Sequence, residues 1–131
     1  MFGYACVQID ITHGSHHDLT NPVVLSMNRG WIQSGRVAAL WLAPPCITWS
    51  RARLNGKNGW PPPLRNLDHI LGLPGLSEQH QAQTYEGNTT MLIACRLAAI
   101  AAKCNVPVGF DVESSARLEV VRQTAFSHCH C

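Results

Sequence analysis

The residues best suited to chemistry lie in one short stretch, Pro45-Cys46-Ile47-Thr48-Trp49-Ser50, which follows an apolar run from Val37 to Ala43. This run is too short for a typical helix and is stopped by two prolines, so it predicts a fully buried β-strand. A cysteine just beyond such a strand lies at the edge where open α/β sheets bind their ligands. Cys46 is therefore a candidate nucleophile, and the alternative is a buried, inert thiol.

Basic side chains follow the cysteine, with no acid among them. Arg51, Arg53, Lys57 and Arg65 form this group. It predicts a local positive patch with Ser50, Arg51 and Arg53 as nucleic-acid contacts, although an ordinary solvated loop explains it equally well. The net charge of +2 is too small to argue for a nucleic-acid partner by itself.

The elements that must position these residues alternate between strands and helices. In chain order they are a strand at 4–11, a helix at 22–33, the strand at 37–43, a long loop at 44–76 with a helical turn near 67–71, a helix at 78–103, a strand at 106–112 and a short helix at 115–125. Asn21 and Ser77 suit the N-caps of the two longer helices. Alternation of this kind predicts a Rossmann-like parallel sheet with crossover helices, in a single α/β domain at 1–126.

Within the helix at 78–103, the spacing of Leu92, Cys95 or Arg96, Ala99 and Ala102 predicts one packing side, and Gly87 and Asn88 weaken the first half. The acids near predicted strand ends are Asp10, Asp111 and Glu113. The carboxyl ends of parallel strands line one crevice, so these carboxylates are expected near Cys46.

The six cysteines include no Cys-x-x-Cys pair, and the N-terminus lacks the form of a signal peptide. We therefore expect an intracellular protein with free thiols, in the nucleus or cytoplasm and not in a membrane. The residues His128-Cys129-His130-Cys131 suggest metal ligands, but no second ligand pair accompanies them. A disordered tail at 127–131 without metal is the preferred interpretation.

The stretch Pro45-Cys46-x-x-Trp49-Ser50 resembles the catalytic motif of the DNA cytosine methyltransferases that modify carbon 5, in which Pro-Cys is followed by an aromatic-Ser pair at this spacing. Residues 3–10 (GYACVQID) are similar to the end of that family's first motif and its second strand. Asp18-Leu19 is similar to the pair that meets adenine, and residues 110–113 lie where the family has a Glu-Asn motif.

The resemblance implies an incomplete methyltransferase-type core that uses S-adenosylmethionine and acts on DNA. Cys46 would add to carbon 6 of a cytosine turned out of the base stack, and Glu113 or Asp111 would meet the ring nitrogen. The implied cofactor contacts are Asp10 for the ribose, Asp18 and Leu19 for the adenine, and Pro45 beside the catalytic cysteine.

Several features of the family are missing from the sequence. No glycine-rich cofactor loop precedes Gly3, no target-recognition region follows, and Ile47 replaces a common glutamine. Cofactor binding is therefore expected to be weak or absent. The alternative functions are a non-catalytic nucleic-acid-binding or interaction domain, and an inactive fragment of a methyltransferase-derived gene.

Overall fold

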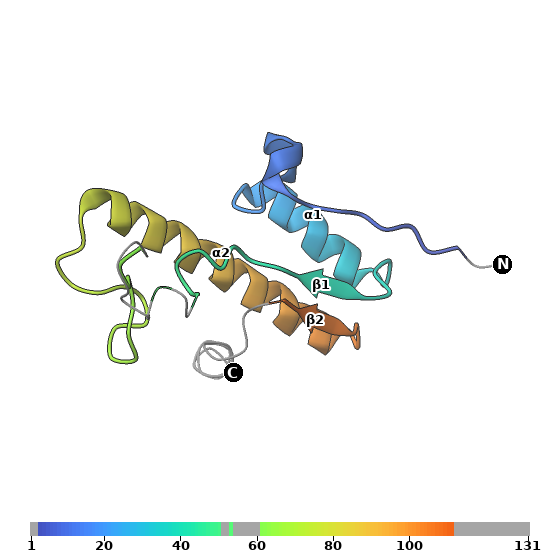
Figure 1. Ribbon diagram of the computed structural model, residues 1–131. Coiled ribbons are helices and arrows are strands. Elements are labelled where there is room, and N and C mark those ends of the chain that lie inside the picture. The colour runs from blue at the N-terminus through green and yellow to red at the C-terminus, as the bar shows by residue number, and fades with distance from the viewer. Residues whose placement is uncertain (1–2, 51–52, 54–60, 112–131) are drawn as a thin grey trace.

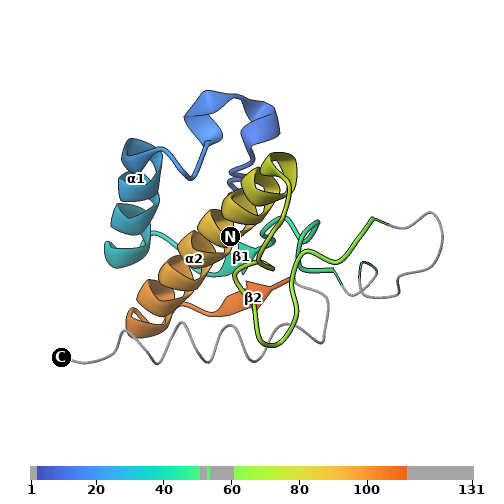
Figure 2. The same cartoon turned by 90° about the vertical axis from the view of Figure 1, so that its left-hand side faces the viewer.

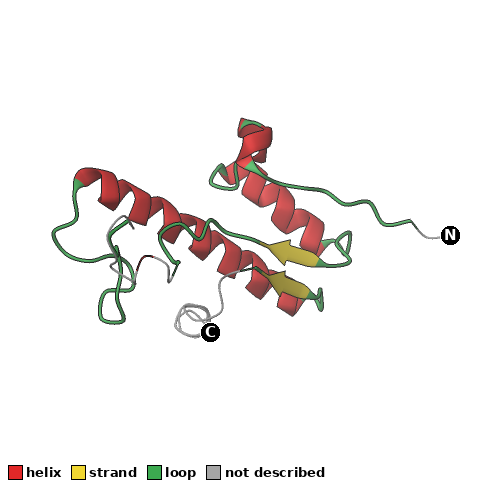
Figure 3. Ribbon diagram, viewed as in Figure 1, coloured by secondary structure: helices red, strands yellow, loops and turns green. Residues whose placement is uncertain are grey.

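The computed structural model describes residues 3–50, 53 and 61–111, which form a mixed α/β arrangement (Figure 1). Two 3-10 turns at Ile11–His13 and Ser15–His17 precede the regular elements. The regular elements are α1 (Pro22–Gln33), β1 (Leu40–Leu42), α2 (Glu78–Lys103) and β2 (Val108–Phe110). Among these regular elements, β1 and α2 are the consecutive pair farthest apart in the sequence, and Figure 3 shows the described parts of their connection in green.

Both helices begin where the sequence predicts. The Asn21 side chain accepts a hydrogen bond from the backbone N–H of Val23, at 2.9 Å, and Pro22 occupies the first helical position. The Ser77 hydroxyl oxygen accepts one from the N–H of His80, at 3.3 Å. These caps satisfy backbone donors that no earlier carbonyl of the helix can reach, so both predicted helices are confirmed.

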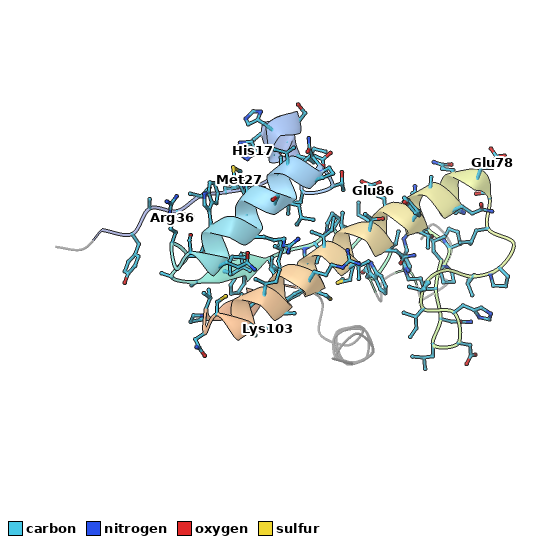
Figure 4. All side chains as sticks on the ribbon, turned by 180° about the vertical axis from the view of Figure 1, so that it is seen from behind. His17, Met27, Arg36, Glu78, Glu86 and Lys103 are labelled. Carbon is cyan, nitrogen blue, oxygen red and sulfur yellow. The ribbon has the colours of Figure 1, made fainter. Side chains whose placement is uncertain are left out.

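The charges along α2 complement its macrodipole. Glu78 lies in the first turn and Lys103 in the last, and Figure 4 shows them at opposite ends of the helix. The peptide dipoles leave a partial positive charge at the N-terminus of a helix and a partial negative charge at its C-terminus. The acid at the start of α2 and the base at its end therefore both stabilise it.

The sheet has two parallel strands, with Leu40 opposite Val108 and Leu42 opposite Phe110. The N–H of Leu40 donates to the carbonyl of Pro107 at 2.9 Å, and the N–H of Asp111 donates to that of Leu42 at 2.8 Å. The chain passes from one strand to the other through α2, so the prediction of parallel strands joined by a crossover helix is confirmed for this pair.

Helix α2 packs against α1 and against both strands. It lies behind the sheet in Figure 1 and in front of it in the reversed view of Figure 4. The main core contains Ile32, Leu42, Ile93, Ala94, Leu97, Ala101 and Val106. Ala101 is fully buried, as expected of a small side chain that lets the helix approach its neighbours closely.

The predicted packing side of α2 is wrong for most of its members. Leu92, Ala99 and Ala102 are exposed, as is Arg96, whereas Cys95 is buried. The apolar residues surround much of this helix, so their spacing alone does not fix its rotation. Contacts with the strands and the loop select the buried side.

The predicted strand at 37–43 is shorter and less buried than expected. Only Leu40–Leu42 pair as a strand, and Trp41 is 70% exposed. Its indole ring lies against Gly109, where a larger residue would collide with it. Helix α2 covers one face of the sheet (Figure 2). Along β1 the buried Leu42 follows the exposed Trp41, so the prediction of burial on both faces is wrong.

The predicted strand at 4–11 does not form, and Tyr4 and Val7 are 85% and 63% exposed. Near 67–71 the described chain has turns instead of a helix. The N–H of His69 donates to the carbonyl of Asn66 at 3.3 Å, and that of Gly72 donates to the carbonyl of His69 at 3.1 Å. The strand predicted at 106–112 is Val108–Phe110. The predicted helix at 115–125 and tail at 127–131 lie outside the described residues. None of the described helices is long and apolar enough to span a membrane.

Candidate functional site

Cys46 lies beyond the carboxyl end of β1 and is exposed. Its carbonyl oxygen accepts hydrogen bonds from the backbone N–H groups of Trp49 and Ser50, each at 2.8 Å. These bonds close a tight turn over residues 46–50, which we call the thiol turn. The thiol is therefore presented to solvent from an ordered loop at the edge of the sheet.

Trp49 attaches the thiol turn to α2. Its side chain is buried and packs with Met91 and Cys95 of that helix. The indole Nε1–H donates to the carbonyl of Gly87 at 3.2 Å. An indole combines a large apolar surface with one donor, and here both are used on the same helix.

Arg65, from the long loop, lies beneath the thiol turn and is only 7% exposed. Its Nε donates to the Thr48 carbonyl at 3.1 Å, its Nη1 to the Ile70 carbonyl at 2.7 Å and to Asn88 Oδ1 at 2.6 Å, and its Nη2 to Thr48 Oγ1 at 3.0 Å and to the Thr84 carbonyl at 3.1 Å. A guanidinium has five N–H donors, so all of them are used. The same group stacks on the Trp49 ring, with Cζ 3.7 Å from the centroid.

The charge of Arg65 persists at neutral pH. Burial lowers the pKa of Arg65 to about 10, which still leaves the guanidinium protonated at pH 7. All five acceptors are neutral, and no carboxylate within the described ranges bonds to it. A buried cation, whose hydrogen-bond partners in the described chain are neutral, therefore contacts the thiol turn at Thr48 and Trp49.

Gly87 of α2 allows the thiol turn and Arg65 to pack closely against the helix. A Cβ at position 87 would overlap Thr48 Oγ1 and would lie 3.2 Å from Arg65 Nη2 and 3.3 Å from Trp49 Nε1. The neighbouring Asn88 accepts from Arg65 and donates from Nδ2 to the Leu71 carbonyl, at 2.9 Å. The two residues that weaken α2 as a helix are thus the ones that hold the loop. The sequence contained a signal for this cluster. It was the Gly87-Asn88 pair inside a predicted helix, together with Arg65, an arginine without an adjacent acid.

Asp111 directly follows β2 and is exposed, so it lies at the same edge of the sheet as Cys46. Its backbone is fixed by the hydrogen bond from its N–H to the Leu42 carbonyl. Both residues therefore follow the carboxyl ends of paired parallel strands, and the approach of the Asp111 carboxylate to the thiol stays a prediction. Glu113, the other candidate acid, lies outside the described residues.

Asp10 and Asp18 bind their own turns. Asp10 Oδ1 accepts from the Thr12 backbone N–H at 2.9 Å and from the Thr12 hydroxyl at 2.7 Å. Asp18 Oδ1 accepts from the Thr20 N–H and hydroxyl at 2.8 and 2.7 Å. The backbone and side-chain bonds from Thr12 lower the pKa of Asp10, and those from Thr20 lower the pKa of Asp18. Both are turn-forming acids, which agrees with the general preference of Asp for such positions.

The predicted cofactor residues do not assemble into a site for S-adenosylmethionine. The resemblance requires a strand that ends at Asp10 and places it at the edge of the sheet. The structure has no strand before α1 among the described residues. Leu19 packs against the main core, whereas Pro45 is exposed beside Cys46. The described residues therefore do not fit the cofactor by themselves.

Replacing Thr12 by valine is expected to raise the pKa of Asp10 towards its ordinary value, because the hydroxyl donor is lost. The backbone donor remains, so the pKa should stay below that value. A lowered carboxyl pKa stabilises the fold above the unfolded-state pKa, and this contribution disappears as the pH falls through the folded-state pKa. NMR titration of the Asp10 carboxyl carbon measures the shift, and Asp18 serves as the control that should not move.

The predicted nucleic-acid contacts are placed differently from one another. Arg53 is 9% exposed, and its Nη1 donates to the Pro62 carbonyl at 3.2 Å, so it is buried instead of solvated. Ser50 is half-buried in the thiol turn. Arg51 lies outside the described residues, as does the His-Cys-His-Cys tail. In the part that the structure describes, no three His, Cys, Asp or Glu side chains meet as metal ligands.

The fold and site together define an α/β chain with an exposed cysteine on a braced turn at the edge of a parallel sheet. Comparison with known proteins adds no assignment, because no family model, curated protein or solved structure matches this chain.

Proposed function

We propose that Cys46 is the nucleophile of a Rossmann-like, cytosine-C5 methyltransferase-type domain that acts on DNA. The observation that carries the proposal is the placement of an exposed cysteine on the thiol turn, with Asp111 at the end of the neighbouring strand. The similarity of the Pro-Cys-x-x-Trp-Ser stretch to that family supports the same assignment.

The proposed step is a conjugate addition. The thiolate of Cys46 forms a bond to carbon 6 of cytosine. The electrons of the 5,6 double bond form a double bond between carbons 4 and 5, and those of the double bond between carbon 4 and N3 move to N3. The carboxylic acid of Asp111 gives its proton to the ring nitrogen N3, so no negative charge accumulates there. Carbon 5 then has enamine character and accepts an electrophile. Loss of the carbon 5 proton, expulsion of the thiolate and return of the N3 proton to Asp111 restore the aromatic base.

In the family that the chain resembles, S-adenosylmethionine supplies the methyl group. The described residues do not form its site, so we assign no step to it here. The addition by Cys46 can be tested without the donor, because a solvent deuteron can also act as the electrophile at carbon 5.

The test is hydrogen exchange at carbon 5 of cytosine. A single-stranded oligonucleotide in D₂O avoids the energy of turning a base out of a duplex. The wild-type chain is expected to incorporate deuterium at carbon 5, measured by mass spectrometry of the recovered nucleosides. Cys46→Ser should reduce the exchange to its rate in buffer. Cys104→Ser is the matched control, because Cys104 is also exposed but lies at the far end of α2.

The same assay separates the two candidate acids. If Asp111 is the proton donor, Asp111→Asn slows exchange by roughly a hundredfold, a typical effect of losing general-acid catalysis, and Glu113→Gln has little effect. The reverse result assigns the role to Glu113. Exchange by the wild-type chain no faster than by Cys46→Ser would reject the enzymatic proposal.

A non-catalytic nucleic-acid-binding or interaction domain is the second candidate. The 70% exposure of Trp41 favours it, because an exposed indole is a common stacking and docking group. This alternative predicts salt-sensitive binding of the oligonucleotide without hydrogen exchange at carbon 5.

A further inference from the structure

We propose that Arg65 is the positioning residue of the Cys46 thiol, and that its buried charge makes the thiol turn a site for an anion. The inference deepens the proposed function, because an addition of this kind needs a thiolate held in one place. Its test, however, does not depend on cytosine.

The geometric part of the inference rests on Thr48. This residue lies inside the thiol turn, and Arg65 bonds both its carbonyl and its hydroxyl, at 3.1 and 3.0 Å. The Trp49 ring stacks on the same guanidinium. Two consecutive residues of the turn are thus fixed to one planar group, which itself is fixed to α2 through Thr84 and Asn88. Because the Cys46 carbonyl closes the same turn, these contacts restrain Cys46 as well.

The electrostatic part rests on the absence of a counter-charge among the residues that the structure describes. The five acceptors of Arg65 are all neutral, and the group is 7% exposed, so solvent screens it poorly. A buried cation of this kind stabilises an anion placed above it. Cys46 is exposed in the same turn, which makes an anionic group that approaches its sulfur the natural partner.

The experiment compares alkylation by iodoacetate, an anion, with alkylation by iodoacetamide, its neutral analogue. The ratio of the two rates cancels differences in thiol ionisation and exposure, and it reports the local potential. Cys104 provides an internal control in the same molecule. It lies sixteen residues after Asn88, roughly 24 Å along the helix axis, well beyond the screening length at physiological salt.

In the wild-type chain the ratio at Cys46 is expected to exceed that at Cys104 by roughly threefold to tenfold at low salt, and to fall as salt is added. Arg65→Gln should remove most of this difference. The control Arg96→Gln, which changes net charge equally at an exposed position on α2, should preserve it. Arg65→Lys should keep the ratio but slow both reactions or make them heterogeneous, because the ammonium cannot fix Thr48 and α2 together. Peptide mass spectrometry resolves the two cysteines.

Equal ratios at Cys46 and Cys104 in the wild-type chain, without salt dependence, would overturn the inference, and this result requires no variant to fold. An elevated ratio that survives in folded Arg65→Gln would assign the potential to other groups and also reject it. An elevated, Arg65-dependent ratio without hydrogen exchange at carbon 5 would support the inference and reject only the proposed function.

Discussion

Replacing Arg65 by methionine is expected to lower the free energy of unfolding by about 3–5 kcal/mol. The variant loses five hydrogen bonds and leaves acceptors on the buried Thr48 and Thr84 and on the half-buried Ile70 and Asn88 without this donor. Each unsatisfied buried acceptor costs about 1–3 kcal/mol, although relaxation of the loop and entry of water recover part of the total. A loss of this size is a large fraction of the stability of an ordinary domain.

Urea unfolding followed by circular dichroism measures this loss, with Arg96→Met as the control. Arg96 is exposed on α2, and methionine has a similar helix propensity, so the control should stay within about 0.5 kcal/mol of the wild type. Equal stabilities of Arg65→Met and Arg96→Met would show that the guanidinium does not hold the loop against the helix.

Alanine substitutions at two helical glycines are expected to have opposite effects. Gly87→Ala should destabilise the chain by about 1–3 kcal/mol, because the new Cβ overlaps Thr48 Oγ1 and crowds Arg65. Thr48 can avoid it only by rotating its hydroxyl away and breaking the bond to Arg65. Gly30→Ala, in α1, should stabilise by about 0.5–1 kcal/mol, because no atom lies within 4 Å of its Cβ position and alanine is the better helix former.

The pair forms its own control, since the chemical change and the secondary structure are the same. The difference between the two unfolding free energies isolates the tertiary contact at position 87. If both substitutions stabilise the chain equally, α2 does not pack closely on the thiol turn. A thiol turn displaced by Gly87→Ala should also alter the alkylation rate of Cys46 while leaving that of Cys104 unchanged.

The sequence by itself determined both helices and their starting points. Helix starts are set by short-range effects, because a capping side chain or a proline at the first helical position acts on backbone groups next to it. Asn21, Pro22 and Ser77 therefore indicate the helix starts without any tertiary contact. The position of Cys46 beyond a parallel strand was also predictable, because the apolar run and the two prolines limit how far the strand can extend, whereas the exposure of its thiol was left open.

Only the tertiary structure decided which apolar segments pair and which polar ones are buried. The segment at 4–11 has the pattern of a strand, but pairing needs a neighbour, and no strand of the described chain lies beside it. The segment around Arg65 has the composition of a solvated loop. Acceptors on Thr48, Thr84 and Asn88, which are distant in the sequence, and on the nearby Ile70 nevertheless remove its guanidinium from water. Local propensity depends on adjacent residues, whereas burial depends on contacts that only folding brings together.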